Sequence, residues 1–218
     1  MNKAIEIHER LLQKFGEPIW RNPLPPLDEL VSTILSQSTN DNNRDKAFDA
    51  LRARFPSWEA VRDANESEVI ATIRPAGLAN QKGPRIQNIL QRITEIRGEL
   101  SLDFLKDSSP EDALNWLVQF KGVGPKTASI VLLFSLGKPA FPVDTHVNRL
   151  SGRLGLRPEK MNAVQAHDYL AAQFPPETYY AAHLNLIRLG REICKARKPL
   201  CLKCPLQDIC VYYAENPE

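Results

Sequence analysis

The sequence contains no long apolar segment and no large excess of charge of either sign. Its longest apolar run, Ile130 to Phe134, is far shorter than the ~18 residues of a membrane-spanning helix. The N-terminal stretch MNKAIEIHER lacks the apolar segment of a signal peptide. The formal net charge is only +2, so a nucleic-acid partner would need a local basic patch. We therefore expect no membrane partner and a cytoplasmic location, associated with the nucleoid if the source is prokaryotic.

Alternation with a period of two residues is also missing, so no β-strand is predicted. Apolar residues recur instead with helical spacing, and the 17 prolines fall mostly between these patterns. The helical patterns cover residues 28–36, 46–55, 67–73, 86–96, 110–120, 126–136 and 163–174. Ser109-Pro110-Glu111 is a strong helix start signal. The sequence predicts an all-α protein whose two breaks, at 17–26 and 137–142, separate two helical lobes with a cleft between them.

Cysteine is absent from the first 193 residues, and all four cysteines follow with the spacing C-x6-C-x2-C-x5-C. Four thiols so close together in a cytosolic chain indicate a metal centre rather than disulfides. Zinc sites usually contain paired C-x2-C motifs, and only one is present, whereas four thiolates also suit an iron–sulfur cluster. The spacing favours a cluster and leaves zinc open. The candidate ligands are Cys194, Cys201, Cys204 and Cys210.

Acidic residues are missing between Cys194 and Cys204, where the chain carries Lys195, Arg197, Lys198 and Lys203. Such a run is often only a solvated surface segment. Held at both ends by a metal centre, however, it would present cations to DNA phosphates at little ordering cost. We interpret it as a local DNA-binding patch.

The segment QFKGVGPKTA, residues 119–128, joins two predicted helices through Gly122, Val123 and Gly124. Glycines permit positive φ and close approach of a ligand, and amides at a helix start attract anions such as phosphate. The same residues would also suit a plain glycine turn.

Lys126 follows this turn at the start of the second helix. The helix dipole disfavours a cation there, so we expect the amine to lose its proton more easily. A neutral lysine amine is a nucleophile suited to Schiff-base chemistry at a sugar carbon. A solvated surface lysine is the simpler alternative.

The motif FKGVGPKTA, with Asp144 of VDTH eighteen residues after the lysine, resembles the endonuclease III family of helix-hairpin-helix DNA glycosylases. GLANQKG, residues 77–83, is similar to the family's GLYNSKA loop, and the cysteine spacing is similar to that of its [4Fe-4S] cluster. The resemblance extends from about residue 28 to residue 210.

This resemblance implies a six-helix barrel lobe at 24–136 containing the hairpin, and a cluster lobe formed by 1–23 and 137–218. It implies a monomeric, bifunctional DNA glycosylase and AP lyase that removes oxidised pyrimidines from damaged double-stranded DNA. Lys126 would attack C1′, and β-elimination would then cleave the strand. Asp144, which on sequence alone is an N-cap residue, would be the catalytic carboxylate.

Two further DNA contacts follow from the resemblance. Leu78 would be the wedge that enters the base stack when a nucleotide is flipped. The orphan base would be met by the loop LSQSTND, which departs from the familiar LSAQATD. Aligning the LS pair selects Ser38, whereas aligning Q-x-T selects Gln37. We prefer Gln37, because an amide can satisfy any orphaned base edge.

Three other kinds of protein share part of these features. The adenine mismatch branch normally lacks the lysine and has a catalytic glutamate where Ser32 stands, and we expect no room here for its additional recognition domain. A non-catalytic helix-hairpin-helix module would not need Lys126 and Asp144 at this spacing. An electron-transfer protein would not need so long a helical region before its cysteines.

Overall fold

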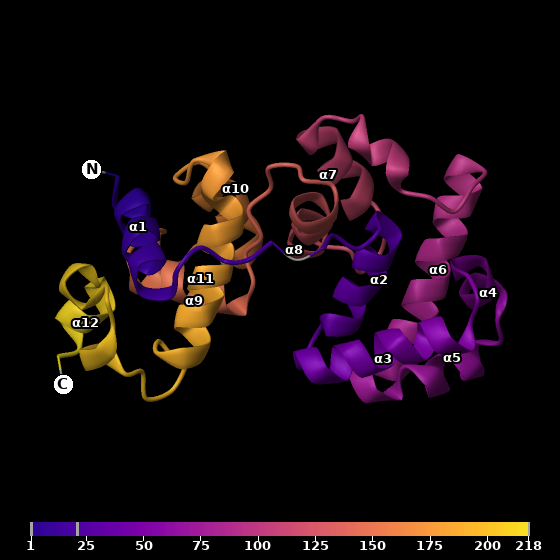
Figure 1. Cartoon of the computed structure of the whole chain (residues 1–218), viewed down its shortest axis with the longest axis horizontal. Helices are drawn as coiled ribbons and strands as arrows, with labels where there is room; N and C mark the ends of the chain where they lie inside the picture. Colours follow the sequence, from indigo (N-terminus) through magenta and orange to yellow (C-terminus); the bar gives the residue numbers. More distant parts are fainter. Residues whose placement is uncertain (1, 21, 218) are drawn as a thin grey trace. The chain divides into compact units, whose positions relative to one another are not determined.

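A computed structural model of the chain describes residues 2–20 and 22–217, and in that part all regular structure is helical (Figure 1). This confirms the predicted all-α class. Within the same residues, no helix is both long and apolar enough to cross a membrane.

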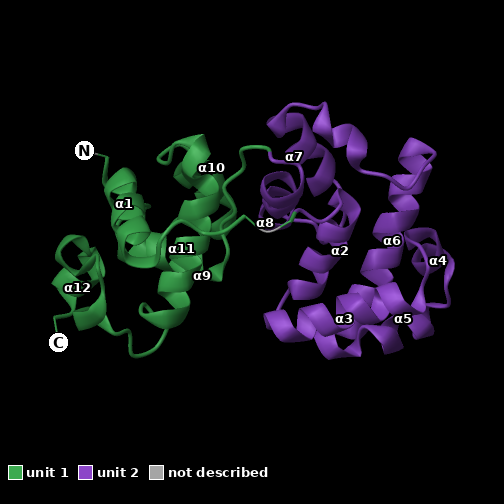
Figure 2. Ribbon diagram, in the orientation of Figure 1, with its two compact units in different colours: residues 1–22, 138–218 green, residues 23–137 purple. Residues whose placement is uncertain are grey.

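The chain forms two compact units (Figure 2). Unit 1 comprises residues 1–22 and 138–218, and unit 2 comprises residues 23–137. The N-terminal helix therefore belongs to the same unit as the C-terminal region. Each unit has its own core.

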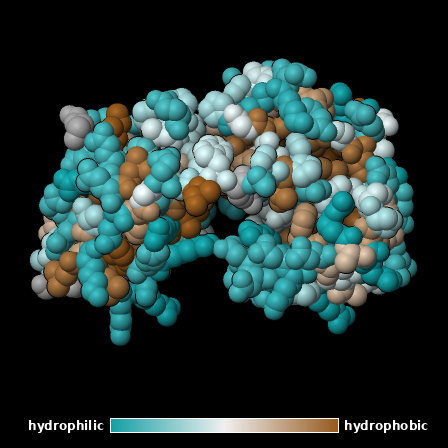
Figure 3. All heavy atoms as spheres, in the orientation of Figure 1, coloured by the Kyte–Doolittle hydropathy of each residue, from teal (hydrophilic) through white to brown (hydrophobic). Residues whose placement is uncertain are grey.

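Unit 2 is built around α2, whose residues are almost all buried and which packs against α3, α6 and α8. Its helices are α2 (Pro26–Ser36), α3 (Asp41–Arg54), α4 (Trp58–Asp63), α5 (Glu66–Thr72), α6 (Ala79–Arg97), α7 (Pro110–Val118) and α8 (Pro125–Ile130). A π-helical turn, η3 (Val131–Ser135), continues α8. The helix α3, by contrast, buries Ala47 and Leu51 and presents hydrophilic side chains to solvent (Figure 3).

Side-chain caps explain where four helices of unit 2 begin. Asn40, Ser57, Asn65 and Ser109 precede α3, α4, α5 and α7, and each accepts a hydrogen bond from a backbone N–H of the first turn. Each cap of this kind contributes about 1 kcal/mol. The predicted start signal at Ser109 is confirmed.

The predicted loop at residues 77–83 was wrong in its extent. Only Gly77 and Leu78 lie before α6, which begins at Ala79, seven residues before the predicted start. Gly83 and Pro84 are unfavourable within a helix, and they made this segment resemble a loop. Tertiary packing overrides that preference, because Lys82, Gly83, Ile86 and Gln87 are buried.

Unit 1 is built around α11 (Tyr179–Glu192), which packs against α1 (Lys3–Phe15) and α9 (Thr145–Arg153). It also contains α10 (Ala163–Ala171) and α12 (Val211–Glu215). Gly190 allows the close approach of α9, because a Cβ there would lie 2.7 Å from His146 Nδ1. The helix α11 was not predicted: nine of its residues are buried, and two of these, His183 and Asn185, are polar and interrupt the apolar spacing.

Candidate functional site

Of the two glycines in the hairpin turn between α7 and α8, only one has a backbone conformation that requires glycine. Gly122 has φ +92°, which L-residues other than glycine rarely adopt, whereas Gly124 has an extended backbone with φ −94°. The side chain of Val123 is buried between them, and its N–H donates to the Phe120 carbonyl at 2.9 Å. Val123 therefore stabilises the turn with both its side chain and its amide.

Lys126 is the second residue of α8, directly after Pro125, and its side chain is half-buried. Gly124, the N-cap residue, is exposed, and no residue that the structure describes accepts a bond from its N–H. The turn thus carries an amide donor two residues before an amine. This arrangement allows an anion to be held by the backbone beside a nucleophilic side chain.

The predicted orphan-base residue contacts the hairpin turn. Gln37, the C-cap residue of α2, donates from Nε2 to the Gly122 carbonyl at 3.3 Å. Arg85 of α6 donates from Nη1 to Gln37 Oε1 at 2.7 Å. Ser38, the other candidate, is exposed and has φ +54°. The structure therefore brings the α2–α3 loop and the hairpin together through Gln37.

Leu78 is 51% exposed although it is a large apolar residue, and it has φ +49° as the N-cap residue of α6. A left-handed conformation costs a non-glycine residue about 1–2 kcal/mol. The described residues contain three such positions, Ser38, Leu78 and Lys198. Each lies in a segment for which the sequence predicts DNA contact, and strain of this kind is concentrated at functional sites.

Lys82 is a residue whose role sequence reasoning missed. It is only 1% exposed, and its Nζ donates to the carbonyls of Leu35 at 2.7 Å and Ala76 at 2.9 Å. Leu35 lies two residues before Gln37, and Ala76 two residues before Leu78. Burial and the nearby Arg85 charge lower the pKa of Lys82. Nothing in the spacing of these residues identifies the contact.

In unit 1, Asp144 is the N-cap residue of α9, and its Oδ1 accepts from the Val147 N–H at 2.7 Å. Two buried histidines fix the segment before it. His167 Nε2 accepts from the Val143 N–H at 3.1 Å, and His183 Nδ1 donates to the Pro142 carbonyl at 2.9 Å. The N-cap role expected from the sequence is present, and the second carboxylate oxygen is left for other contacts.

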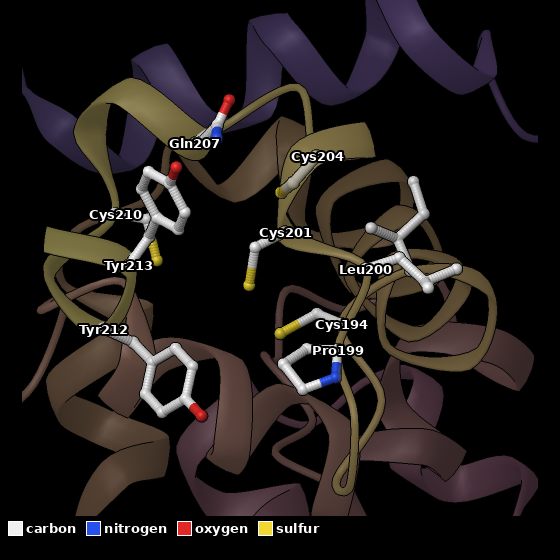
Figure 4. Close-up of a pocket in the computed structure, with 10 residues that line it drawn as sticks. Cys194, Pro199, Leu200, Cys201, Cys204, Gln207, Cys210, Tyr212 and Tyr213 are labelled. Carbon is white, nitrogen blue, oxygen red and sulfur yellow. The ribbon is translucent and has the colours of Figure 1, made fainter. Parts of the chain in front are cut away.

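The four cysteines line one pocket of unit 1, together with Pro199, Tyr212 and Tyr213. Their sulfur atoms lie around a common space (Figure 4). Burial, and to a smaller extent the neighbouring cysteines, raise the pKa of Cys204 to about 11. Four thiolates gathered in this way require compensating positive charge, which iron ions would provide. The donor set therefore fits an iron–sulfur cluster.

The basic loop between Cys194 and Cys204 is held from one side by α9. Arg153 donates to the carbonyls of Lys195 at 2.8 Å and Ala196 at 3.0 Å, and to Cys194 Sγ at 3.3 Å. Arg149 donates to the Cys194 carbonyl at 3.0 Å and to the Gly190 carbonyl at 3.0 Å. With its backbone fixed, the loop exposes the charged side chains of Lys195, Arg197, Lys198 and Lys203.

Two known families match the regions that carry these features. Residues 31–176, which include the hairpin, Lys126 and Asp144, match the HhH-GPD superfamily of base excision DNA repair proteins. Residues 194–210, which contain the four cysteines, match the iron–sulfur binding domain of endonuclease III. The second match identifies the cysteine pocket as an iron–sulfur site.

Individual proteins show the same similarity. Endonuclease III of Sulfolobus acidocaldarius is 33% identical over 86% of this chain and 82% of its own length. A DNA glycosylase homologue of Arabidopsis thaliana is 38% identical over 79% of this chain. The aligned region covers 59% of the length of that relative. A trapped endonuclease III–DNA covalent intermediate, an estranged-adenine complex, aligns with a TM-score of 0.84 and 26% identity over 99% of this chain and 98% of its own.

Proposed function

The chain belongs to the endonuclease III family of base excision repair enzymes, which are DNA glycosylases and AP lyases, and from this premise we propose that it acts on oxidised pyrimidines in duplex DNA. In this proposal it works as a monomer and cleaves the strand on the 3′ side of the abasic site that it creates.

Lys126 is the nucleophile in the proposed reaction. Its neutral amine attacks C1′ of the flipped nucleotide, the bond from C1′ to the base breaks, and the base leaves with the electron pair and takes up a proton. Opening of the sugar ring gives an imine between Lys126 and C1′. Loss of a C2′ proton then expels the 3′ phosphate by β-elimination. The placement of Lys126 directly behind the glycine turn of the hairpin carries this proposal.

Asp144 is the carboxylate that stabilises positive charge developing on the sugar and helps to move protons. Its N-cap bond uses Oδ1 and fixes the orientation of the carboxylate, so that Oδ2 can face the substrate. The two buried histidines that hold residues 142 and 143 support this orientation.

DNA is held mainly through its phosphates. The amide of Gly124 and the cations of the basic loop supply contacts that do not depend on sequence, whereas Leu78 and Gln37 enter the stack at the lesion. Because cations of the loop displace counterions from the DNA, affinity should fall steeply as salt increases.

We also propose that the cluster is of the [4Fe-4S] type, ligated by Cys194, Cys201, Cys204 and Cys210. When bound, it cross-links the two ends of the basic loop. The cluster has a structural role in this proposal, since it holds the basic loop in place. The lysines and the arginine of that loop contact the DNA.

A panel of lesion-containing duplexes tests the proposal. The purified protein should cleave strands that carry ring-saturated or oxidised pyrimidines, and each product should have the 3′ end expected of β-elimination. Release of a base without strand cleavage would contradict the lyase step. Action restricted to adenine in mismatches would instead support the monofunctional branch.

A further inference from the structure

The side chain of Arg85 connects two loops that are far apart in the sequence. It extends from α6, donates to Gln37 Oε1 at 2.7 Å, and through Gln37 is linked to the Gly122 carbonyl, which accepts from Nε2 at 3.3 Å. All three residues belong to unit 2. The guanidinium is half-buried, so this bond is better shielded from water than a surface contact.

Arg85 also occupies the space where a side chain at position 122 would lie. A Cβ on Gly122 would be 2.4 Å from both Cδ and Nε of Arg85. A side chain at position 122 would therefore displace Arg85 from its present place, in addition to the strain of the positive φ. The close fit shows that the hairpin turn and the Arg85 side chain are packed as one piece.

The two bonds fix which way the glutamine amide faces. Arginine only donates and a carbonyl only accepts, so Gln37 Oε1 must face Arg85 and Nε2 must face Gly122. An amide has two N–H donors and two lone pairs, which leaves one donor and one acceptor for a base edge. The amide is oriented before DNA arrives.

We propose that Arg85 is a positioning residue that acts through Gln37, holding its amide against the hairpin turn in the orientation that meets the orphan base. This inference rests on the proposed function, because it takes Gln37 as the residue that fills the gap. Ordering the amide in advance lowers the entropic cost of binding, which strengthens the complex.

The test is a double-mutant cycle on DNA binding, with Arg85→Met, Gln37→Ala and the double variant. The probe is a duplex containing a tetrahydrofuran abasic analogue, which cannot form an imine, opposite a normal base. Each single variant should weaken binding about tenfold. The double variant should bind no more weakly than either single variant, because both substitutions remove the same interaction with the orphan base. On a duplex with the analogue in both strands, which has no orphan base, all variants should bind like the wild type.

Two controls accompany the cycle. Methionine retains the aliphatic stem of Arg85, and melting temperatures check that each variant folds. Arg92→Met, on the same helix, removes an exposed charge that pairs with Glu95 and should leave binding unchanged.

Losses that multiply to about a hundredfold in the double variant would overturn the inference, because Arg85 would then act independently of Gln37. Equal losses on the duplex without an orphan base would do the same. An unaffected Gln37→Ala variant would also overturn it and would leave Ser38 as the residue for the gap. None of these readouts needs cleavage, so a failure of the proposed chemistry is distinguishable from a failure here.

Discussion

At the residue scale, Leu78 combines exposure with a strained backbone. Leu78→Gly should relieve the left-handed strain and should therefore not destabilise the fold. It should nevertheless slow the processing of stably paired lesions more than that of a preformed abasic site, because the latter costs less to flip. Single-turnover rates on the two substrates measure the difference, and Leu78→Met serves as the control that retains apolar volume. Equal losses on both substrates would remove the wedge assignment.

Lys82 is expected to contribute to stability rather than to chemistry. Lys82→Met leaves the buried carbonyls of Leu35 and Ala76 without their donor. The free energy of unfolding should fall by about 2–3 kcal/mol. Urea denaturation measures it, with the exposed Lys46→Met as the matched control, which should change stability by less than about 0.5 kcal/mol. A Lys82→Met variant as stable as the wild type would show that these bonds contribute nothing net.

At the scale of elements, α9 links the proposed carboxylate to the cluster loop. Asp144 caps the start of the helix, and Arg149 in its middle and Arg153 at its end hold the backbone around Cys194. His146 lies between Asp144 and Arg149 in the sequence and packs against Arg149 and Gly190. Burial lowers the pKa of His146, so a neutral, structural histidine is favoured. The helix thus fixes two functional regions of unit 1 at once.

Arg153→Met should loosen the cluster loop without unfolding unit 1. We expect iron release to a chelator to become several-fold faster and DNA affinity to fall, because three bonds to residues 194–196 are lost. Visible absorbance follows the release. Arg188→Met, which removes an exposed arginine of α11 paired with Glu192, is the control. An unchanged release rate in the Arg153 variant would exclude a role in holding the loop.

Sequence patterns predicted several helices from their apolar spacing, but they missed α4, which Ser57 caps, and the first turn of α3. The start of α7 at Ser109 was predictable because the cap is local. The start of α6 was not, because Gly83 and Pro84 indicate a loop, whereas in the structure Gly83 and its neighbour Lys82 are buried as part of the helix. In α11 the buried polar residues His183 and Asn185 interrupt the apolar spacing.

At the scale of the whole molecule, the cluster is expected to determine stability and DNA affinity together. Freshly purified protein should be yellow-brown and contain iron and sulfide at about four each per chain. Cys201→Ser should lower both the melting temperature and DNA affinity, because the basic loop loses its anchor. Stoichiometric zinc without visible absorption in anaerobically prepared protein would contradict the cluster assignment.

The candidate site could be predicted from the sequence only where its residues are adjacent. The hairpin motif with Lys126, the N-cap position of Asp144 and the cysteine spacing are all local patterns. The bond of Gln37 with Gly122 joins residues 85 positions apart, and those of Arg85 with Gln37 and of Lys82 with Leu35 join residues 48 and 47 positions apart. Such contacts depend on how α6 packs in unit 2, which no local pattern specifies.

Borohydride trapping shows whether the glycine turn presents Lys126 as the nucleophile. Borohydride reduces the imine, so the wild type should become covalently bound to DNA carrying an abasic site. Lys126→Gln should give no trapped complex and no strand cleavage, yet bind duplex with nearly unchanged affinity, because the phosphate contacts near it come from backbone amides. A Lys126→Gln variant that is trapped at the wild-type rate would place the nucleophile elsewhere and contradict the account.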